Sequence, residues 1–207
     1  MRLDPVVNRL KFDRELARLQ DGREILEQRG IFLLATTYPS IDFVLVPRHR
    51  LRAIVPITQK TLVFLPAGAQ AVAEIPGISA CAFKAHFDLS NYDLDPPSLD
   101  FRDPWTNQVL AYNQMFRALQ FDQFRKAHVV LLDDHPATHK PFLCLRGIRE
   151  YHEHPQHSGD EWLLYREDFS IFSIVLSLWR VSVDLVHPVL FLQENSAQVQ
   201  WTAEEKL

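Results

Sequence analysis

The spacing of apolar residues predicts that the chain opens with a helix. Asp4 followed by Pro5 is a typical helix start, because an acidic side chain caps the first N–H groups and proline fits the first helical position. The segment that follows is rich in Leu, Arg and Glu. We expect a break at Asp21-Gly22 and a stop at Gly30, where glycine readily ends a helix.

Short apolar runs separated by turns come next and predict an antiparallel meander. Within residues 41–46 the more apolar side chains fall on alternate positions, as expected of a strand with one buried face. A later run, 79–89, alternates in the same way and places Cys81 on its apolar face, which favours a buried core thiol. The four runs assigned to the meander are 31–37, 42–47, 51–57 and 61–65.

Farther along, the apolar period changes again. Asp95-Pro96-Pro97 requires an extended passage, and helical spacing within 105–127 predicts one or two helices there. A short strand is expected at 129–132, a polar His-rich loop at 152–161, and a helix from Asp168 to roughly Leu185. Side chains that these periodicities place in the core are Phe83, Phe87, Leu99, Phe101, Phe142, Phe172, Val175 and Trp179.

Length, charge and residue composition exclude several classes of protein. With 207 residues, 47% of them apolar, the chain is long enough for one domain with a sizeable core. A net charge of −4 and no run of Lys or Arg give no reason to expect a nucleic-acid partner. The longest apolar stretch, 169–179, is too short to cross a membrane. Two cysteines and no apolar N-terminal segment predict a cytoplasmic protein with reduced thiols.

The densest chemistry lies between Asp133 and His157, and Cys144 is its central residue. A thiol becomes a nucleophile when nearby positive charge or hydrogen-bond donors support its thiolate. His135, His139 and Lys140 stand close to Cys144 in the sequence and are suitable neighbours. The alternative, in which Cys144 is a core residue among Phe142, Leu143 and Leu145, stays open at this point.

A second hypothesis makes Cys144 a metal ligand. Glu150, His152 and His154 alternate in sequence, so an extended segment would point all three to one side. Together with Cys144 they would offer one sulfur, one oxygen and two nitrogens, a plausible tetrahedral zinc set. His157 could replace either histidine, and a solvated acidic loop is the simpler alternative.

The order of these features resembles the ubiquitin-conjugating enzyme family. Tyr92 and the Pro96-Pro97 pair are similar to that family's Tyr-Pro…Pro-Pro segment. His135-Pro136 followed by Cys144-Leu145 resembles its His-Pro-Asn motif and active-site cysteine. Trp162, ahead of the last predicted helix, resembles the Trp that follows that cysteine. The resemblance covers most of the chain.

Three departures accompany this resemblance. Ala137 stands where the family has Asn, and about thirty residues separate Phe101 from His135 where the family has only a few. The stretch between Cys144 and Trp162 is longer and carries the Glu and His residues. That feature is similar to a bacterial family named for Cys, Glu, His and His, classed as predicted metal-binding and associated with operons for ubiquitin-like proteins and their activating enzymes.

The resemblance implies a fold and a function. We expect a single α+β domain over 1–207, of ubiquitin-conjugating type, with a helical insertion at about 103–128 and a His-rich loop at about 150–160. Cys144 would accept a ubiquitin-like protein from an activating enzyme as a thioester and pass it to a target. His135 would hold the turn, and His139, Glu150 or His152 would transfer protons. Oxyanion stabilisation would then come from backbone N–H groups or the Thr138 hydroxyl.

Two other functions stay open. In the first, the chain is a catalytically silent scaffold that binds zinc through Cys144, Glu150, His152 and His154 and pairs with an active conjugating enzyme. A cysteine closed into such a site is not free to carry an acyl group, so the two hypotheses exclude each other. The second is a zinc hydrolase that uses Glu150, His152 and His154.

Overall fold

The N-terminal helices begin and end as the sequence predicts. In the computed structural model, the Asp4 carboxylate accepts hydrogen bonds from the N–H groups of Val6 and Val7, at 2.8 and 3.4 Å, and caps α1 (Pro5–Asp21). Gly22 separates α1 from α2 (Arg23–Gln28). Gly30 follows with φ +76°, a conformation that favours glycine. The structure describes residues 2–46, 49–56, 70–75, 83–112, 118–122, 127–157, 161–184, 189–192 and 197–203.

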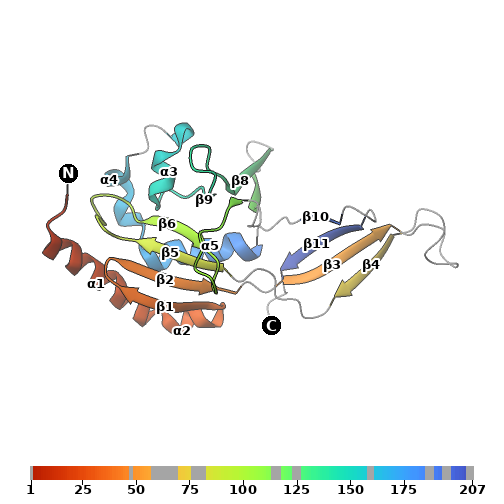
Figure 1. Cartoon of the computed structure of the whole chain (residues 1–207), viewed down its shortest axis with the longest axis horizontal. Coiled ribbons are helices and arrows are strands. Elements are labelled where there is room, and N and C mark those ends of the chain that lie inside the picture. The colour runs from red at the N-terminus through yellow and green to blue at the C-terminus, as the bar shows by residue number, and fades with distance from the viewer. Residues whose placement is uncertain are drawn as a thin grey trace.

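A four-stranded antiparallel sheet lies beside these helices (Figure 1). Its order is β1-β2-β5-β6, and each strand pairs with the next along that order. The Pro96-Pro97 pair lies in a non-helical passage between β5 and β6, as predicted. The overall class is therefore α+β with an N-terminal helix and an antiparallel four-stranded sheet. The strands are β1 (Ile31–Thr37), β2 (Ser40–Leu45), β5 (Phe83–Asp88) and β6 (Ser98–Arg102).

The predicted path of the meander is wrong after its second strand. The third apolar run forms β3 (His49–Pro56), which pairs with β4 (Gln70–Ile75) and β11 (Ala197–Ala203) in a separate sheet. The fourth strand of that sheet is β10 (Val189–Leu192). The predicted run 61–65 lies outside the described residues. Local alternation identifies a strand but carries no information about its partner, so consecutive runs were assigned to one sheet.

The predicted helical insertion is also wrong where the structure describes it. β7 (Ala118–Asp122) and β8 (Ala127–Asp134) form an antiparallel hairpin, which β9 (Pro141–Leu143) extends to three strands. Val109, expected on a helix, instead forms an isolated bridge with Arg102. The helical spacing of apolar residues in this stretch coincides with short strands, because a few matches to either period occur by chance.

Helical structure returns after β9. α3 (Arg149–Glu153), the 3₁₀ turn η2 (Pro155–His157), α4 (Trp162–Tyr165) and η3 (Arg166–Asp168) precede α5 (Ile171–Asp184). The predicted His-rich loop is therefore partly helical, and the predicted last helix is confirmed with a later start. Asp168 ends η3, whereas the Ser170 hydroxyl accepts from the Ser173 N–H at the beginning of α5.

Six of the eight side chains that the sequence predicts to lie in the core are buried. Phe83, Phe87, Leu99, Phe101, Phe142 and Val175 are each at most 4% exposed. Phe172 and Trp179 are only partly buried. The apolar side chains of Ile171, Ile174, Val175 and Leu178 are fully buried in α5, and Phe172 and Trp179 lie on the flanks of that apolar stripe.

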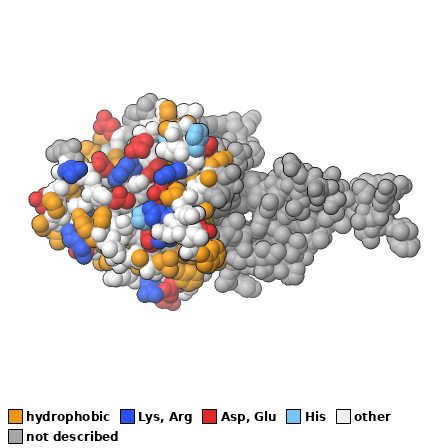
Figure 2. All heavy atoms as spheres, viewed as in Figure 1, with side chains coloured by type: hydrophobic (Ala, Val, Ile, Leu, Met, Phe, Trp, Pro, Cys, Tyr) orange, Lys and Arg blue, Asp and Glu red, His pale blue; other side chains and the backbone are white. Residues whose placement is uncertain are grey.

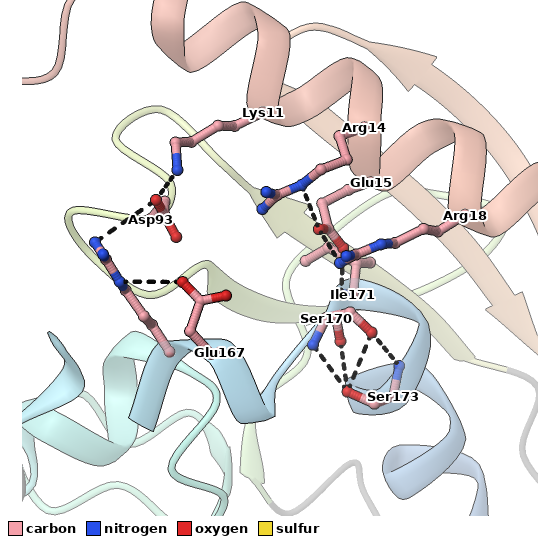
Figure 3. A network of polar contacts seen from close by, with 10 residues as sticks. Lys11, Arg14, Glu15, Arg18, Asp93, Glu167, Ser170, Ile171 and Ser173 are labelled. Atoms are coloured by element: carbon pink, nitrogen blue, oxygen red, sulfur yellow. Dashed lines mark hydrogen bonds and ion pairs between the residues drawn. The ribbon is translucent and has the colours of Figure 1, made fainter. Parts of the chain in front are cut away.

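Buried charges connect the N-terminal helix to the C-terminal half of the chain (Figure 3). Glu15 is fully buried, and its carboxylate accepts from the N–H of Ile171 at 3.0 Å, at the start of α5. Arg18 donates to the same carboxylate at 2.9 Å. Asp93, in the connection between β5 and β6, contacts Lys11 of α1 and lies 3.7 Å from Arg166 of η3. Both acidic groups therefore tie separate segments of the chain together.

The surface of the described residues mixes charges of both signs. On the face in Figure 2, basic and acidic side chains lie interspersed among apolar ones. Among the described helices, none is both long and apolar enough to cross a membrane.

Candidate functional site around Cys144

The candidate site begins at a tight turn between β8 and β9. The backbone N–H of His135 donates to the carbonyl of Lys140 at 3.0 Å, while its carbonyl accepts from the N–H groups of Thr138 and His139. The His135 ring folds into the turn, where Nδ1 accepts from the N–H of Ala137 at 3.3 Å. His135 is only 3% exposed. Its backbone and side chain together define the shape of this turn.

Cys144 follows β9 directly and is partly buried. Its thiol is free, and Sγ lies 3.4 Å from Nε2 of His157, within hydrogen-bond range for sulfur. Partial burial raises the pKa of the Cys144 thiol above its ordinary value. At neutral pH the proton therefore resides on sulfur, and the His157 imidazole lies within hydrogen-bond distance of it.

His157 reaches Cys144 because the chain turns back after β9. Two successive backbone bonds, from the N–H of His154 to Tyr151 and from the N–H of His157 to His154, keep this segment coiled. The His157 ring stacks on Tyr151, with ring centroids 3.9 Å apart and planes 17° from parallel. The coiled backbone thus brings residue 157 back over residue 151.

This coiling separates the predicted metal ligands. Glu150, His152 and His154 would share a face only on an extended segment, whereas successive helical residues are rotated by about 100°. The Glu150 carboxylate accepts from the Ser98 hydroxyl and, at 3.1 Å, from the N–H of Leu99.

The two histidines of that set make different contacts. His152 Nε2 lies 2.8 Å from the carbonyl of Arg146, while the His154 ring stacks on Phe142. Among the residues that the structure describes, no three His, Cys, Asp or Glu side chains converge in an arrangement suited to a metal ion. The structure therefore does not bring Cys144, Glu150, His152 and His154 together as a four-ligand set.

His139 lies at the outer surface of the turn. Its φ is +54°, its side chain is 78% exposed, and Nδ1 lies 3.3 Å from a carboxylate oxygen of Asp134. The structure thus brings His157, rather than His139 or His152, to the thiol.

A polar pocket of about 250 Å³ lies between β6, the turn and α3. Its walls include His135, Thr138, Lys140 and Glu150, but not Cys144. Lys140 and Asp100 both line this pocket, and Lys140 donates to Asp100 at 2.9 Å. Glu150 and His135, both predicted as site residues, therefore line the same pocket. The Cys144 thiol is not part of its lining.

Glu150 should make the stability of the protein depend on pH. Burial raises the pKa of its carboxyl above the ordinary value of 4.5, although hydrogen bonds from Ser98 and Leu99 oppose the shift. The folded protein then binds this proton more tightly than the unfolded chain, so the stability contributed by Glu150 is present at low pH. That contribution is lost as pH rises through the raised pKa.

Glu150→Gln is accordingly expected to gain stability relative to the wild type between pH 4 and pH 7, as measured by urea unfolding. Glu150→Ala should lose about 1–3 kcal/mol at pH 7, because the N–H of Leu99 loses its acceptor. Glu161→Gln, at an exposed carboxyl outside this helix, is the control. Parallel stability curves for wild type and Glu150→Gln would contradict this account.

Sequence reasoning named His157 only as a substitute metal ligand and did not name Tyr151. The available signal was the spacing of Tyr151, His154 and His157 at every third residue, which suits a helical or 3₁₀ path. That signal becomes visible only if the segment is taken as coiled rather than extended.

Comparison with known proteins gives a family for this chain. A family model described as Y4jH-like matches residues 3–66 and 128–185, and the second segment includes both Cys144 and His157. The "Uncharacterized protein y4jH" of Sinorhizobium fredii (strain NBRC 101917 / NGR234) is 33% identical over 181 residues. That alignment covers 79% of this chain and 75% of the relative. The chain therefore belongs to the Y4jH family.

Proposed function

We propose that the protein is a carrier of ubiquitin-conjugating type, which holds a ubiquitin-like protein as a thioester on Cys144. The observation that carries the proposal is the free Cys144 thiol at 3.4 Å from His157, directly after the His135-Pro136 turn and β9. A thiol beside an imidazole is the arrangement that nucleophilic acyl transfer needs.

The order of elements supports the same proposal. α1, an antiparallel four-stranded sheet, a Pro-Pro passage before its last strand, a His-Pro turn, a cysteine and a long helix follow one another along the chain. This is the order that the resemblance to conjugating enzymes implies. The hairpin β7–β8 and the pair β3–β4 are additions to that order.

Loading would be an exchange between two thioesters. Sγ of Cys144 attacks the carbonyl carbon that joins the ubiquitin-like protein to the cysteine of an activating enzyme. A new bond forms from Sγ to that carbon, and the bond to the enzyme's sulfur breaks. The thiol proton passes to Nε2 of His157 and then to the departing thiolate, so no oxidant or reductant is needed.

Discharge runs in the same manner toward a target. A nucleophile on the target attacks the carbonyl carbon and gives a proton to Nε2 of His157, the bond to Sγ breaks, and His157 passes that proton to sulfur. The N–H groups of Ala137 and Thr138 already donate within the turn. We therefore assign the stabilisation of the oxyanion to the Thr138 hydroxyl, in place of the Asn that Ala137 replaces.

Loading with purified partners tests this proposal. Incubation with ATP, a ubiquitin-like protein and its activating enzyme should give an adduct that thiol reductant removes. Cys144→Ser should give a reductant-resistant oxyester or no adduct, and Cys144→Ala none, while Cys81→Ser should load normally. Loading that persists in Cys144→Ala would overturn the carrier role of this thiol, whereas no loading with a verified partner set would favour the silent scaffold.

A further inference from the structure

Three aromatic rings form a column beside the candidate nucleophile. Tyr151, His154 and His157 occur at every third residue, and the backbone of α3 and η2 coils so that they lie near one another. The Tyr151 and His157 rings are stacked at 3.9 Å, and the His154 and His157 centroids are 5.1 Å apart. Only the last of the three, His157, has its ring nitrogen against Cys144.

The His154 ring of this column also contacts β9 and the turn that precedes it. The His154 ring stacks on Phe142 at 5.1 Å, with planes 12° from parallel. The edge of the His135 ring meets both, with centroids 5.6 Å from His154 and 5.5 Å from Phe142. His154 therefore contacts the ring of His135, which lies in the turn before β9, and also the ring of His157, which faces the Cys144 thiol.

We propose that Tyr151 and His154 are positioning residues, whose rings hold His157 in the rotamer that presents Nε2 to Cys144. The inference rests on the proposed function for its role in acyl transfer, but its effect on the reactivity of the thiol is independent of any partner protein. Neither residue takes part in the chemistry; both act through His157.

The physical reason is the short element that carries His157. η2 has three residues, and a side chain on so short a turn otherwise samples several rotamers. A contact at 3.4 Å between Sγ and Nε2 needs both χ angles of His157 fixed. Stacking against Tyr151, together with the contact with the tilted His154 ring, supplies that restraint. His154 must therefore provide a flat ring, not a proton.

Alkylation of Cys144 by iodoacetamide tests this directly. The reaction forms a bond from Sγ to carbon, releases iodide, and passes the thiol proton to the base. In a Cys81→Ser background, where Cys144 is the only thiol, the rate against pH should show an inflection from His157 in addition to that of the thiol. His157→Ala should remove this inflection and slow alkylation at neutral pH by about 10-fold.

The variants of the two positioning residues should then differ from one another in alkylation rate. His154→Ala should approach the His157→Ala profile, whereas His154→Phe, which keeps a ring, should stay within about twofold of the parent rate, as should Tyr151→Phe. Glu153→Gln is the matched control on the same helix. Thermal melts of each variant, together with His154→Gln if His154→Ala fails to fold, separate loss of position from loss of structure.

Two results would overturn the proposal. One is a His154→Ala or His154→Gln protein that alkylates with the parent profile while His157→Ala does not. The other is a folded His154→Phe protein as slow as His157→Ala, which would give the His154 imidazole a chemical role. If the alkylation profiles behave as expected while no variant ever loads a ubiquitin-like protein, the positioning role stands and the proposed function fails.

Discussion

His157→Ala is expected to slow acyl transfer through Cys144 by about 10²–10⁴-fold, the usual contribution of a positioned general acid–base group. The reason is the pairing of Nε2 with a thiol whose pKa is raised by burial, so the thiolate forms only when a base takes the proton. The measurement is the single-turnover rate of loading and of discharge to a free amine. Both steps should slow, because each passes a proton through His157.

The matched control is Gln156→Ala, on the exposed side of the same 3₁₀ turn. It should leave both rates within about twofold. A His157→Ala protein that loads and discharges at wild-type rates would show that the contact with Cys144 is not used. In that case His139 or His152, which the sequence favoured for proton transfer, would need to reach the thiol by rearrangement.

Glu15→Ala is expected to lower the free energy of unfolding by about 2–4 kcal/mol. The buried carboxylate accepts from the N–H of Ile171 and from Arg18, and its removal leaves a buried backbone donor without a partner at the start of α5. Arg14 lies 3.7 Å from the same carboxylate (Figure 3). Urea unfolding monitored by Trp fluorescence measures the loss.

Two further variants give stability losses with which the loss in Glu15→Ala can be compared. Glu15→Gln keeps an oxygen acceptor without the charge and should lose less stability than Glu15→Ala. Glu24→Ala, on α2, is a surface control and should change stability by about 0.5 kcal/mol or less. Equal losses in Glu15→Ala and Glu24→Ala would mean that the contact between α1 and α5 contributes little.

The helix boundaries near the N-terminus could be predicted because local chemistry determines them. The Asp4 cap and the left-handed glycine at residue 30 act within a few residues of themselves. The same holds for β1, whose bounds match the predicted 31–37. Partners of strands are set by contacts distant in sequence, so the departure of β3 to another sheet left no local trace.

The candidate site was predictable in its residue types and not in its geometry. The order of His135, Pro136 and Cys144 identified the segment that carries the thiol. The choice of partner depended on the backbone between 149 and 157: an extended chain aligns Glu150, His152 and His154, whereas the observed α3 and η2 align Tyr151, His154 and His157. Because this segment is coiled and not extended, it brings His157 to the thiol of Cys144 and does not align the predicted metal ligands.

Peptide mapping of the loaded protein by mass spectrometry tests the central claim most directly. After incubation with ATP, the activating enzyme and the ubiquitin-like protein, the peptide that contains Cys144 should carry the acyl remnant, and neutral hydroxylamine, which cleaves thioesters, should remove it. An adduct found on a lysine and resistant to hydroxylamine, with Cys144 still free, would contradict the account.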